Sequence, residues 1–326
     1  MDLSTRYLGL TLKNPLVVGS SGLTRTKAGV LQCEKAGAGA VVLKSIFEEQ
    51  IIHEVAEFVE ESGHQVHPEA ADYIRRYGHD NAVAEFLDLI RDAKREASIP
   101  IIASVHSVSA GAWTRFAEQL EKAGADAIEL NVNVLTSDTR LTGPQMEQVY
   151  FDVAEQVRKV VKIPVALKVG YHFSGMAGLL ARLGHTGIAG LTLFNRPWNP
   201  DIDLDTLEVV AADLYSTPDE FVLPLRWVSI LSGLAGCDLA AATGIHDGKT
   251  AIKMLLAGAT AVQVVSTLYR NGFDQLGAML GEIEGWMGAH GYERLSDFRG
   301  KMSQAEIANP AAFERVQFMK VSVGVE

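Results

Sequence analysis

The 326-residue sequence predicts an α/β fold, a closed (β/α)8 TIM barrel, because short apolar segments typical of strands alternate with helical segments along most of the chain. Strands that are separated by helices pair in parallel through right-handed crossovers. Eight such strands can be counted, and eight units within about 250 residues favour a closed barrel over a doubly wound open sheet. The open sheet is the alternative, but no GxGxxG motif follows the first strand.

Two repeated patterns locate the strands. In four of them a helical segment ends in glycine and a small residue before a short apolar run, as expected where a left-handed turn leads into a buried strand. Two others begin after an Ile-Pro step. In order along the chain, the strands lie within Asn14–Ser21, Glu34–Ser45, Ile99–Ser104, Glu121–Asn131, Ile163–Lys168, Ala181–Asn195, Asp238–Gly244 and Met254–Ser266.

The segments around the strands complete the predicted architecture. Leu3–Lys13 precedes the first strand, and its pattern indicates a hairpin that closes the bottom of the barrel. Long insertions follow strand two (Ser45–Ser98) and strand six (Arg196–Gly236), and βα insertions of this kind lie on the catalytic rim, where they cap a site. We expect a single barrel domain over residues 1–302 and a C-terminal extension over residues 303–326.

Composition excludes several classes of function. The formal net charge of -11 argues against a nucleic-acid partner and against an anionic membrane surface. Cys33 and Cys237 are the only cysteines, so there is neither a disulfide framework nor a CxxC motif, and we expect no metal site. No segment has the length of a transmembrane helix, and the N-terminus has no apolar signal core. These observations predict a soluble cytoplasmic protein.

One stretch, Asp238–Thr267, has the order strand, turn, helix and strand. Its two strands end in Thr243-Gly244 and Ser266-Thr267. Neighbouring parallel strands would bring these hydroxyls and backbone N–H groups to one rim, close to a helix N-terminus, where they suit a phosphate group. The alternative is an ordinary βαβ unit whose glycines serve only its turns.

The other strand ends carry cations, amides and a histidine, but no pair of carboxylates. Lys44 and Lys168 each end an apolar strand, where a lysine is costly unless it meets an anion or an acceptor; the alternative is a lysine that reaches solvent at the rim. Asn131 and Asn195 can each donate and accept, which suits an amide, imide or pyrimidine edge, unless they only cap turns. His106 could carry a proton, although a hydrogen-bonded structural histidine is the commoner case.

These motifs, in this order, resemble those of the class 1 dihydroorotate dehydrogenases, which are FMN-dependent (β/α)8 barrels. The resemblance extends from about Leu3 to Met302. The matching motifs are NPLVVGSSGL, VVLKS, IELNVN and PVALKV at strands one, two, four and five, the block ATGIHDGKTAIKMLLAGATAVQVVST, and the closing LSDFRGKM. It implies that residues 1–302 bind FMN, and that a hydride passes between a small pyrimidine-like or related substrate and flavin N5.

The resemblance also implies a set of cofactor-binding residues. Lys168 would lie near the N1/O2 side of the flavin, where a cation stabilises the anionic reduced form. The strand ends of the block quoted above would hold the phosphate, and Gly233 would reach the phosphate or ribityl chain from the second insertion. The residues implied to contact FMN are Ser20, Ser21, Gly22, Lys44, Asn131, Lys168, Gly233, Thr243, Gly244, Ser266 and Thr267.

Substrate and partners follow from the same resemblance. Lys44 would bridge flavin and substrate, and Asn131 and Asn195 would bind the substrate or the flavin edge. A homodimer is implied. The chain has no cysteine-rich iron–sulfur segment, so any such cluster would belong to an electron-transfer partner.

The clearest departure from the family pattern concerns the general base. The family places a Cys or Ser in the loop after strand four, and here Val134, which cannot accept a proton, stands at that position. General-base catalysis is worth a factor of about 10² to 10⁴, so our first interpretation is an altered substrate. The base would then be Thr136, Ser137 or His106, with Tyr73 or Tyr171 as weaker candidates.

Three alternatives stay open. The chain could be a genuine dihydroorotate dehydrogenase, which oxidises dihydroorotate to orotate in pyrimidine biosynthesis, or a flavin-binding protein that has lost catalysis. A phosphate-binding barrel with a lysine at a strand end could also act as a Schiff-base lyase, with Lys44 or Lys168 as the nucleophile.

Overall fold

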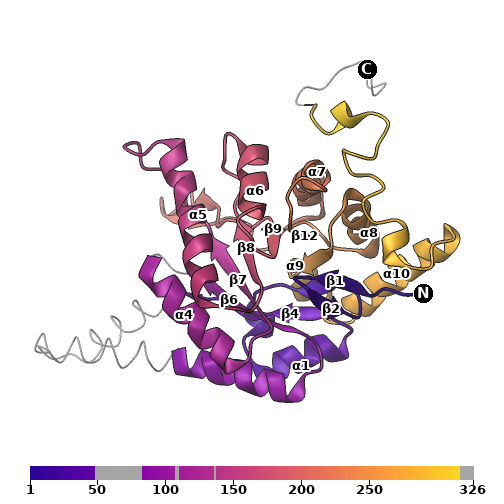
Figure 1. The fold of residues 1–326 in the computed structure, drawn as a ribbon, viewed down its shortest axis with the longest axis horizontal. Coiled ribbons are helices and arrows are strands. Elements are labelled where there is room, and N and C mark those ends of the chain that lie inside the picture. The colour runs from indigo at the N-terminus through magenta and orange to yellow at the C-terminus, as the bar shows by residue number, and fades with distance from the viewer. Residues whose placement is uncertain (48–82, 107–109, 136, 316–326) are drawn as a thin grey trace, which may run out of the picture.

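The computed structural model describes residues 1–47, 83–106, 110–135 and 137–315, and it confirms the predicted barrel (Figure 1). Eight parallel strands follow one another in the spatial order β4-β3-β13-β12-β9-β8-β7-β6, and pairing of β4 with β6 closes the ring. The strands are β3 (Leu16–Val18), β4 (Ala40–Val42), β6 (Ile101–His106), β7 (Ala127–Val132), β8 (Val165–Val169), β9 (Gly190–Leu193), β12 (Asp238–Ala242) and β13 (Ala261–Val264). A two-residue strand, β5 (Ile46–Phe47), extends the pairing along β6.

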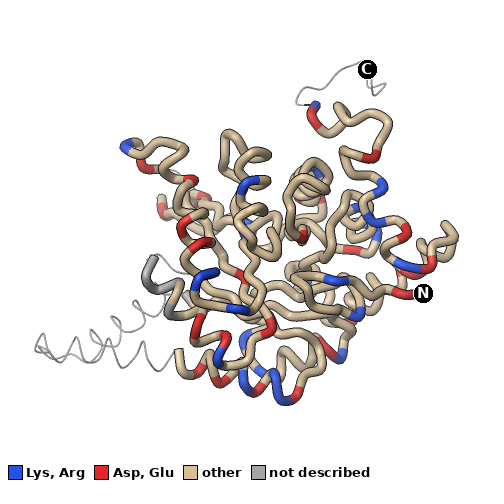
Figure 2. The backbone as a smooth tube through the Cα atoms, viewed as in Figure 1, with Lys and Arg blue, Asp and Glu red and all other residues tan. Residues whose placement is uncertain are grey.

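Helices form the outer layer of the barrel (Figure 1). Basic and acidic residues are intermixed on the outward surface around α1 and α4, as expected for helices that face solvent (Figure 2). Residues 83–96 are also helical. The other helices are α1 (Lys27–Lys35), α4 (Ala110–Ala123), α5 (Gly143–Val160), α6 (Met176–Gly184), α7 (Val222–Leu231), α8 (Gly248–Ala257), α9 (Ser266–Asn271) and α10 (Gln275–Ala289).

The predicted N-terminal hairpin closes the bottom of the barrel. Strands β1 (Thr5–Tyr7) and β2 (Leu10–Leu12) pair antiparallel, and the backbone N–H of Leu8 donates to Oδ2 of Asp238, the first residue of β12 (2.8 Å). Small residues make room for the hairpin, since a Cβ at Gly190 would lie 2.6 Å from Leu8 Cδ2. The resulting apolar floor consists of Tyr7, Leu8, Leu12, Val17, Ala40, Val42, Ile102, Ala127, Ala166, Ala240 and Ala261.

Alternation along the strands places a polar layer directly above this floor. Side chains two residues apart point to the same side of a strand, so the step from Ala127 leads to Glu129 in β7, and the step from Ala261 leads to Gln263 in β13. Lys168 follows Ala166 in β8 in the same way. The inside of the barrel is therefore apolar at the bottom and polar toward the carboxyl ends of the strands.

The two predicted insertions lie where expected, after β4 and after β9. Most of the first insertion, residues 48–82, lies outside the described residues. The second contains an antiparallel hairpin of β10 (Pro200–Ile202) and β11 (Val209–Ala211), then the 3-10 helix η2 (Pro218–Phe221) and α7. A further 3-10 turn, η1 (Gly22–Thr24), follows β3.

The chain continues to hydrogen-bond to the barrel helices on both sides of residue 302, the predicted end of the barrel domain. The N–H of Met302 donates to the carbonyl of Leu256 in α8 (2.8 Å), and that of Gln304 to the carbonyl of Ser229 in α7 (3.1 Å). The 3-10 turns η3 (Leu295–Asp297) and η4 (Pro310–Ala312) flank this segment, and the proposed domain division stays a prediction. Within the described ranges, no helix has the length and apolar character needed to span a membrane.

Candidate active site

A pocket opens at the carboxyl ends of the barrel strands. It brings together six of the residues singled out from the sequence, namely Ser20, Lys168, Asn195, Thr243, Gly244 and Ser266. Its lining also includes Phe194, Arg196, Leu214, Ser216, Ala242, Ile245, Gln263 and Val265.

One corner of the pocket is built from the turn after β12. Thr243 (φ +79°) and Gly244 (φ +76°) both have left-handed backbone conformations, and Thr243 Oγ1 donates to the carbonyl of Phe194 (3.1 Å). Gly244 and Ile245 are buried, and within the described residues their N–H groups donate no hydrogen bond. Buried backbone donors are nearly always paired, so this corner is suited to an acceptor supplied by a ligand.

The N-terminus of α8 contributes less to the turn at Thr243-Gly244 than the sequence predicts. Asp247 caps α8 by accepting from the N–H of Thr250 (2.7 Å), so a carboxylate already occupies that helix terminus. Thr267 Oγ1 donates to the carbonyl of His246 (2.9 Å), which makes this hydroxyl a support for the turn. Ser266 instead lines the pocket.

Ser216, which was not identified from the sequence, connects Ser266 and His246 in this corner of the pocket. Its N–H donates to Ser266 Oγ (3.0 Å), and its Oγ lies 3.1 Å from His246 Nε2. Burial, and secondarily Arg270, lower the pKa of His246, so its neutral ring can accept from the Ser216 hydroxyl. The sequence signal was the capping pattern Thr217-Pro-Asp-Glu220, which marks a helix start directly after Ser216.

Arg196 lies at the mouth of the same pocket and was also missed. Its Nε donates to Glu220 Oε2 (2.9 Å) and its Nη1 to the carbonyl of Asp213 (2.6 Å). These contacts anchor the β10–β11 insertion to the barrel rim.

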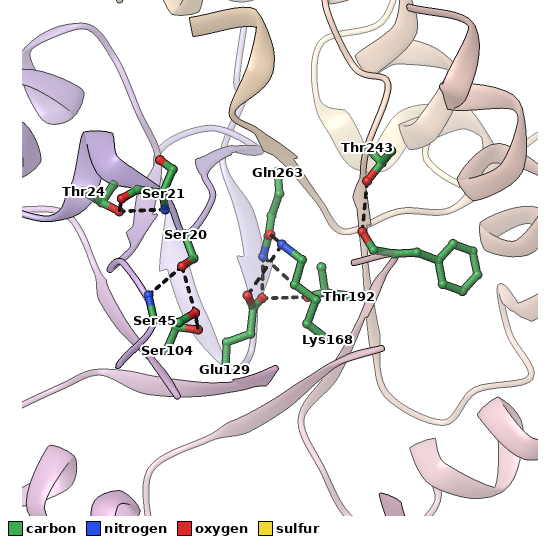
Figure 3. Close-up of polar contacts among 11 residues, drawn as sticks. Ser20, Ser21, Thr24, Ser45, Ser104, Glu129, Lys168, Thr192, Thr243 and Gln263 are labelled. Atoms are coloured by element: carbon green, nitrogen blue, oxygen red, sulfur yellow. Dashed lines mark hydrogen bonds and ion pairs between the residues drawn. The ribbon is translucent and has the colours of Figure 1, made fainter. Parts of the chain in front are cut away.

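The floor of the pocket is a set of linked polar side chains from four strands (Figure 3). Lys168 Nζ donates to Gln263 Oε1 (3.0 Å), and Gln263 Nε2 donates to Glu129 Oε2 (2.5 Å). Thr192 Oγ1 donates to the same carboxylate oxygen (2.8 Å). Glu129, Thr192 and Gln263 were overlooked in the sequence, although strand alternation places each on the inner side, as Glu129 stands two residues before Asn131.

A chain of three serine hydroxyls, which we call the serine wall, runs from Ser20 at the pocket into the buried interior (Figure 3). Ser20 Oγ and Ser45 Oγ are 3.0 Å apart, Ser45 Oγ and Ser104 Oγ are 2.7 Å apart, and the N–H of Ser45 donates to Ser20 Oγ (2.8 Å). Nearby, Ser21 Oγ and Asn131 Oδ1 are buried atoms without a hydrogen-bond partner among the described residues. Such unpaired atoms at a pocket rim indicate that a ligand completes the site.

Lys44 and Gly22 lie at the strand ends next to this wall. Lys44 is half-buried, and burial, with a smaller effect of Arg25, lowers the pKa of its ammonium. A Cβ at Gly22 would lie 2.7 Å from Tyr269 Oη, so the glycine permits a close approach.

The candidates for a general base are scattered. His106 Nδ1 lies 2.7 Å from the carbonyl of Asn131, a structural contact at the rim. Ser137 is exposed, and Tyr171 packs edge-on to Phe194 with ring centroids 6.0 Å apart. Thr136 and Tyr73 lie outside the described residues.

Gly233 requires a correction. It stands between the end of α7 and the start of β12, at the bottom of the barrel, because α7 runs antiparallel to the strands. The five residues of β12 separate it from Thr243-Gly244 by about 16 Å. Gly233 therefore cannot contact a phosphate held in the pocket.

Comparison with known proteins decides the family. The profile of the dihydroorotate dehydrogenase family matches residues 2–287. The chain belongs to the dihydroorotate dehydrogenase family. The family consists of flavin-dependent oxidoreductases that act on CH–CH groups, so the predicted enzyme class is confirmed.

Curated relatives cover nearly the whole chain. Three of them carry the name dihydroorotate dehydrogenase B (NAD(+)), catalytic subunit. The protein of Thermoplasma volcanium is 28% identical over 312 residues (92% of this chain, 98% of the relative). That of Methanocaldococcus jannaschii is 26% identical over 290 residues (86% and 92%), and that of Methanocella arvoryzae is 29% identical over 284 residues (83% and 88%).

The packing of the turn after β12 can be tested at Gly244. A Cβ at this position would overlap the backbone of Glu220 and Phe221, and alanine disfavours φ +76°. We expect Gly244→Ala to lower the free energy of unfolding in urea by about 2–4 kcal/mol. Gly143→Ala, whose Cβ would have no atom within 4 Å, is the control. Equal stabilities of the two variants would contradict the described packing.

Proposed function

We propose that this chain is an FMN-dependent oxidoreductase whose substrate is a small pyrimidine-like or related molecule other than dihydroorotate. The observation that carries the proposal is the convergence of the unpaired N–H groups of Gly244 and Ile245 with the Lys168 ammonium on one pocket. A ligand such as FMN matches these two features, because its anionic phosphate can accept from the N–H groups and its electron-accepting ring can lie beside the ammonium.

The pocket fits FMN on several independent grounds. The phosphate would be held by the turn at Gly244 and by Ser266, with Ser216 behind them. Ser21 Oγ and Asn131 Oδ1, which are buried and unpaired, would contact the ring or the substrate. When bound, FMN would supply the acceptor for the hydride that leaves the substrate.

The residues of the chain would then bind, orient and protect the reacting groups. Lys168 would stabilise negative charge that develops on the cofactor, and its orientation is fixed by Gln263. Asn195 lines the pocket, and its amide can bind both donors and acceptors of a pyrimidine-like edge. Lys44 would bridge cofactor and substrate; burial lowers the pKa of its ammonium, which also makes it a candidate to give up a proton.

Val134 is the reason for proposing an altered substrate. Its side chain is half-buried against the apolar core, and its N–H donates to Tyr150 Oη (3.1 Å). A valine cannot remove a proton, and the base candidates Thr136, Ser137 and His106 remain proposals. The names of the relatives favour genuine dihydroorotate oxidation as the second candidate function.

A Schiff-base lyase is less compatible with the site. Lys168 Nζ donates to Gln263 Oε1 (3.0 Å) and lies 4.0 Å from Glu129 Oε1, so these contacts hold the amine in place and do not leave it free to attack a carbonyl. Family membership also points to redox chemistry.

We propose a homodimer formed through the β10–β11 hairpin. Ile202 and Val209 are opposite each other on one face of this hairpin, and Asp201 points to the other face. The turn adds Leu204 and Leu207, which are 84% and 80% exposed. Contiguous apolar surface of this kind marks an interface, and a second copy can cover it through two-fold symmetry. An electron-transfer partner would be a separate protein.

The two lysines have separable roles. Purified protein should be yellow and release FMN on heating. Lys168→Ala should weaken FMN retention at least about tenfold, because it removes a charge-assisted contact, whereas Lys44→Ala should keep the colour and mainly disable turnover. Lys162→Ala, at an exposed position, is the control. A colourless wild type that borohydride traps with a carbonyl substrate would favour the lyase.

Restoring a base at position 134 tests the proposed substrate change. Dihydroorotate should fail to bleach the wild-type flavin under anaerobic conditions. Val134→Cys should accelerate this bleaching by about 10²-fold or more, because a thiolate can remove the substrate proton. Leu135→Cys, at the exposed neighbouring position, is the control. Rapid bleaching of the wild type would instead establish genuine dihydroorotate oxidation.

The hairpin interface is tested by sedimentation. Leu207→Asp should shift the protein at micromolar concentration from the mass of two chains to that of one, because it places a charge in an apolar contact. Thr206→Asp, at the exposed adjacent position, should leave the dimer intact. A wild type that sediments as a monomer would refute the homodimer.

A further inference from the structure

Glu129 is the only charged residue among the described buried residues, with 1% of its surface exposed. It lies inside the barrel, one layer above the apolar floor. A buried carboxylate is costly unless it is paired and hydrogen-bonded. The groups around Glu129 should therefore include the positive charge that compensates its carboxylate.

Gln263 connects this carboxylate to Lys168, and its amide can do so in only one orientation. The ammonium can only donate, and it donates to Gln263 Oε1 (3.0 Å). On the other side, Gln263 Nε2 donates to Glu129 Oε2 (2.5 Å), as a carboxylate requires. The Gln263 amide therefore turns its oxygen to the Lys168 ammonium and its nitrogen to the Glu129 carboxylate (Figure 3).

The second oxygen of Glu129 faces the same ammonium. Glu129 Oε1 lies 4.0 Å from Lys168 Nζ, and it has no hydrogen-bond partner among the described residues. Below Glu129, burial and then the nearby carboxylate raise the pKa of the Tyr7 hydroxyl, so this group stays neutral. The closest counter-charge to Glu129 is therefore Lys168, on the pocket side.

We propose that Glu129 is a positioning residue that sets the redox potential of the site by orienting Lys168 and offsetting its charge. This inference rests on the proposed FMN-dependent function. Lys168 places a positive charge at the pocket, and Glu129 offsets part of it. A reduced, anionic flavin adds a negative charge to the pocket, so the net charge there affects how strongly the reduced form is stabilised. Without Glu129, the pocket would favour reduced over oxidised cofactor more strongly.

The test is the midpoint potential of the purified, FMN-containing protein. Glu129→Gln removes the charge and nearly keeps the shape, so the potential should become more positive. We expect about a tenfold change in the ratio of the dissociation constants of oxidised and reduced FMN, which is about 30 mV for a two-electron couple. Glu129→Asp keeps the charge and should leave the potential close to wild type. Glu155→Gln, an exposed charge removal on α5, is the control.

Thr192→Val is the second variant if Glu129→Gln does not fold. It removes a donor to Glu129 Oε2, which leaves the carboxylate charge less compensated, so a smaller shift to more negative potential is expected. An unchanged potential in Glu129→Gln, or in Thr192→Val in its place, with a yellow wild type would overturn this inference alone. A wild type without FMN would overturn the proposed function and this inference with it.

Discussion

The alternation of side chains along eight parallel strands is the constraint from which the site follows. Every second residue of each strand must point into the barrel, and the closed ring leaves no other space for it. Small residues at the lowest inner positions, such as Ala127 and Ala261, admit the side chains of the N-terminal hairpin. The next positions, Glu129 and Gln263, are sealed from below by that hairpin, and they hydrogen-bond to each other, to Thr192 and to Lys168 inside the barrel.

This arrangement explains why so polar a layer can be buried. Lys168, Gln263, Glu129 and Thr192 come from four strands and are linked across the inside of the barrel, although Glu129 Oε1 has no hydrogen-bond partner among the described residues. Toward the rim, Ser21 Oγ, Asn131 Oδ1 and the N–H groups of Gly244 and Ile245 also have no hydrogen-bond partner among the described residues. A ligand in the pocket would supply partners for these rim groups.

The fold and the strand-end residues could be predicted because they depend on local pattern. Lys168 and Gly244 follow directly from where an apolar run stops. Ser216 and Arg196 could not be placed in that way, since a long insertion returns them to the pocket through contacts made only in the folded chain. Gly233 was misplaced for a similar reason: the resemblance implied a contact from the second insertion, but α7 has already carried the chain to the bottom of the barrel at this point.

The serine wall has a property that fixed donors lack. The backbone N–H of Ser45 anchors the oxygen of Ser20, but the hydroxyl protons of Ser20, Ser45 and Ser104 can rotate together without moving a heavy atom. Ser20 can therefore either offer its proton to the pocket or turn it inward. A ring whose edge changes from acceptor to donor during a reaction could meet a complementary surface in both states.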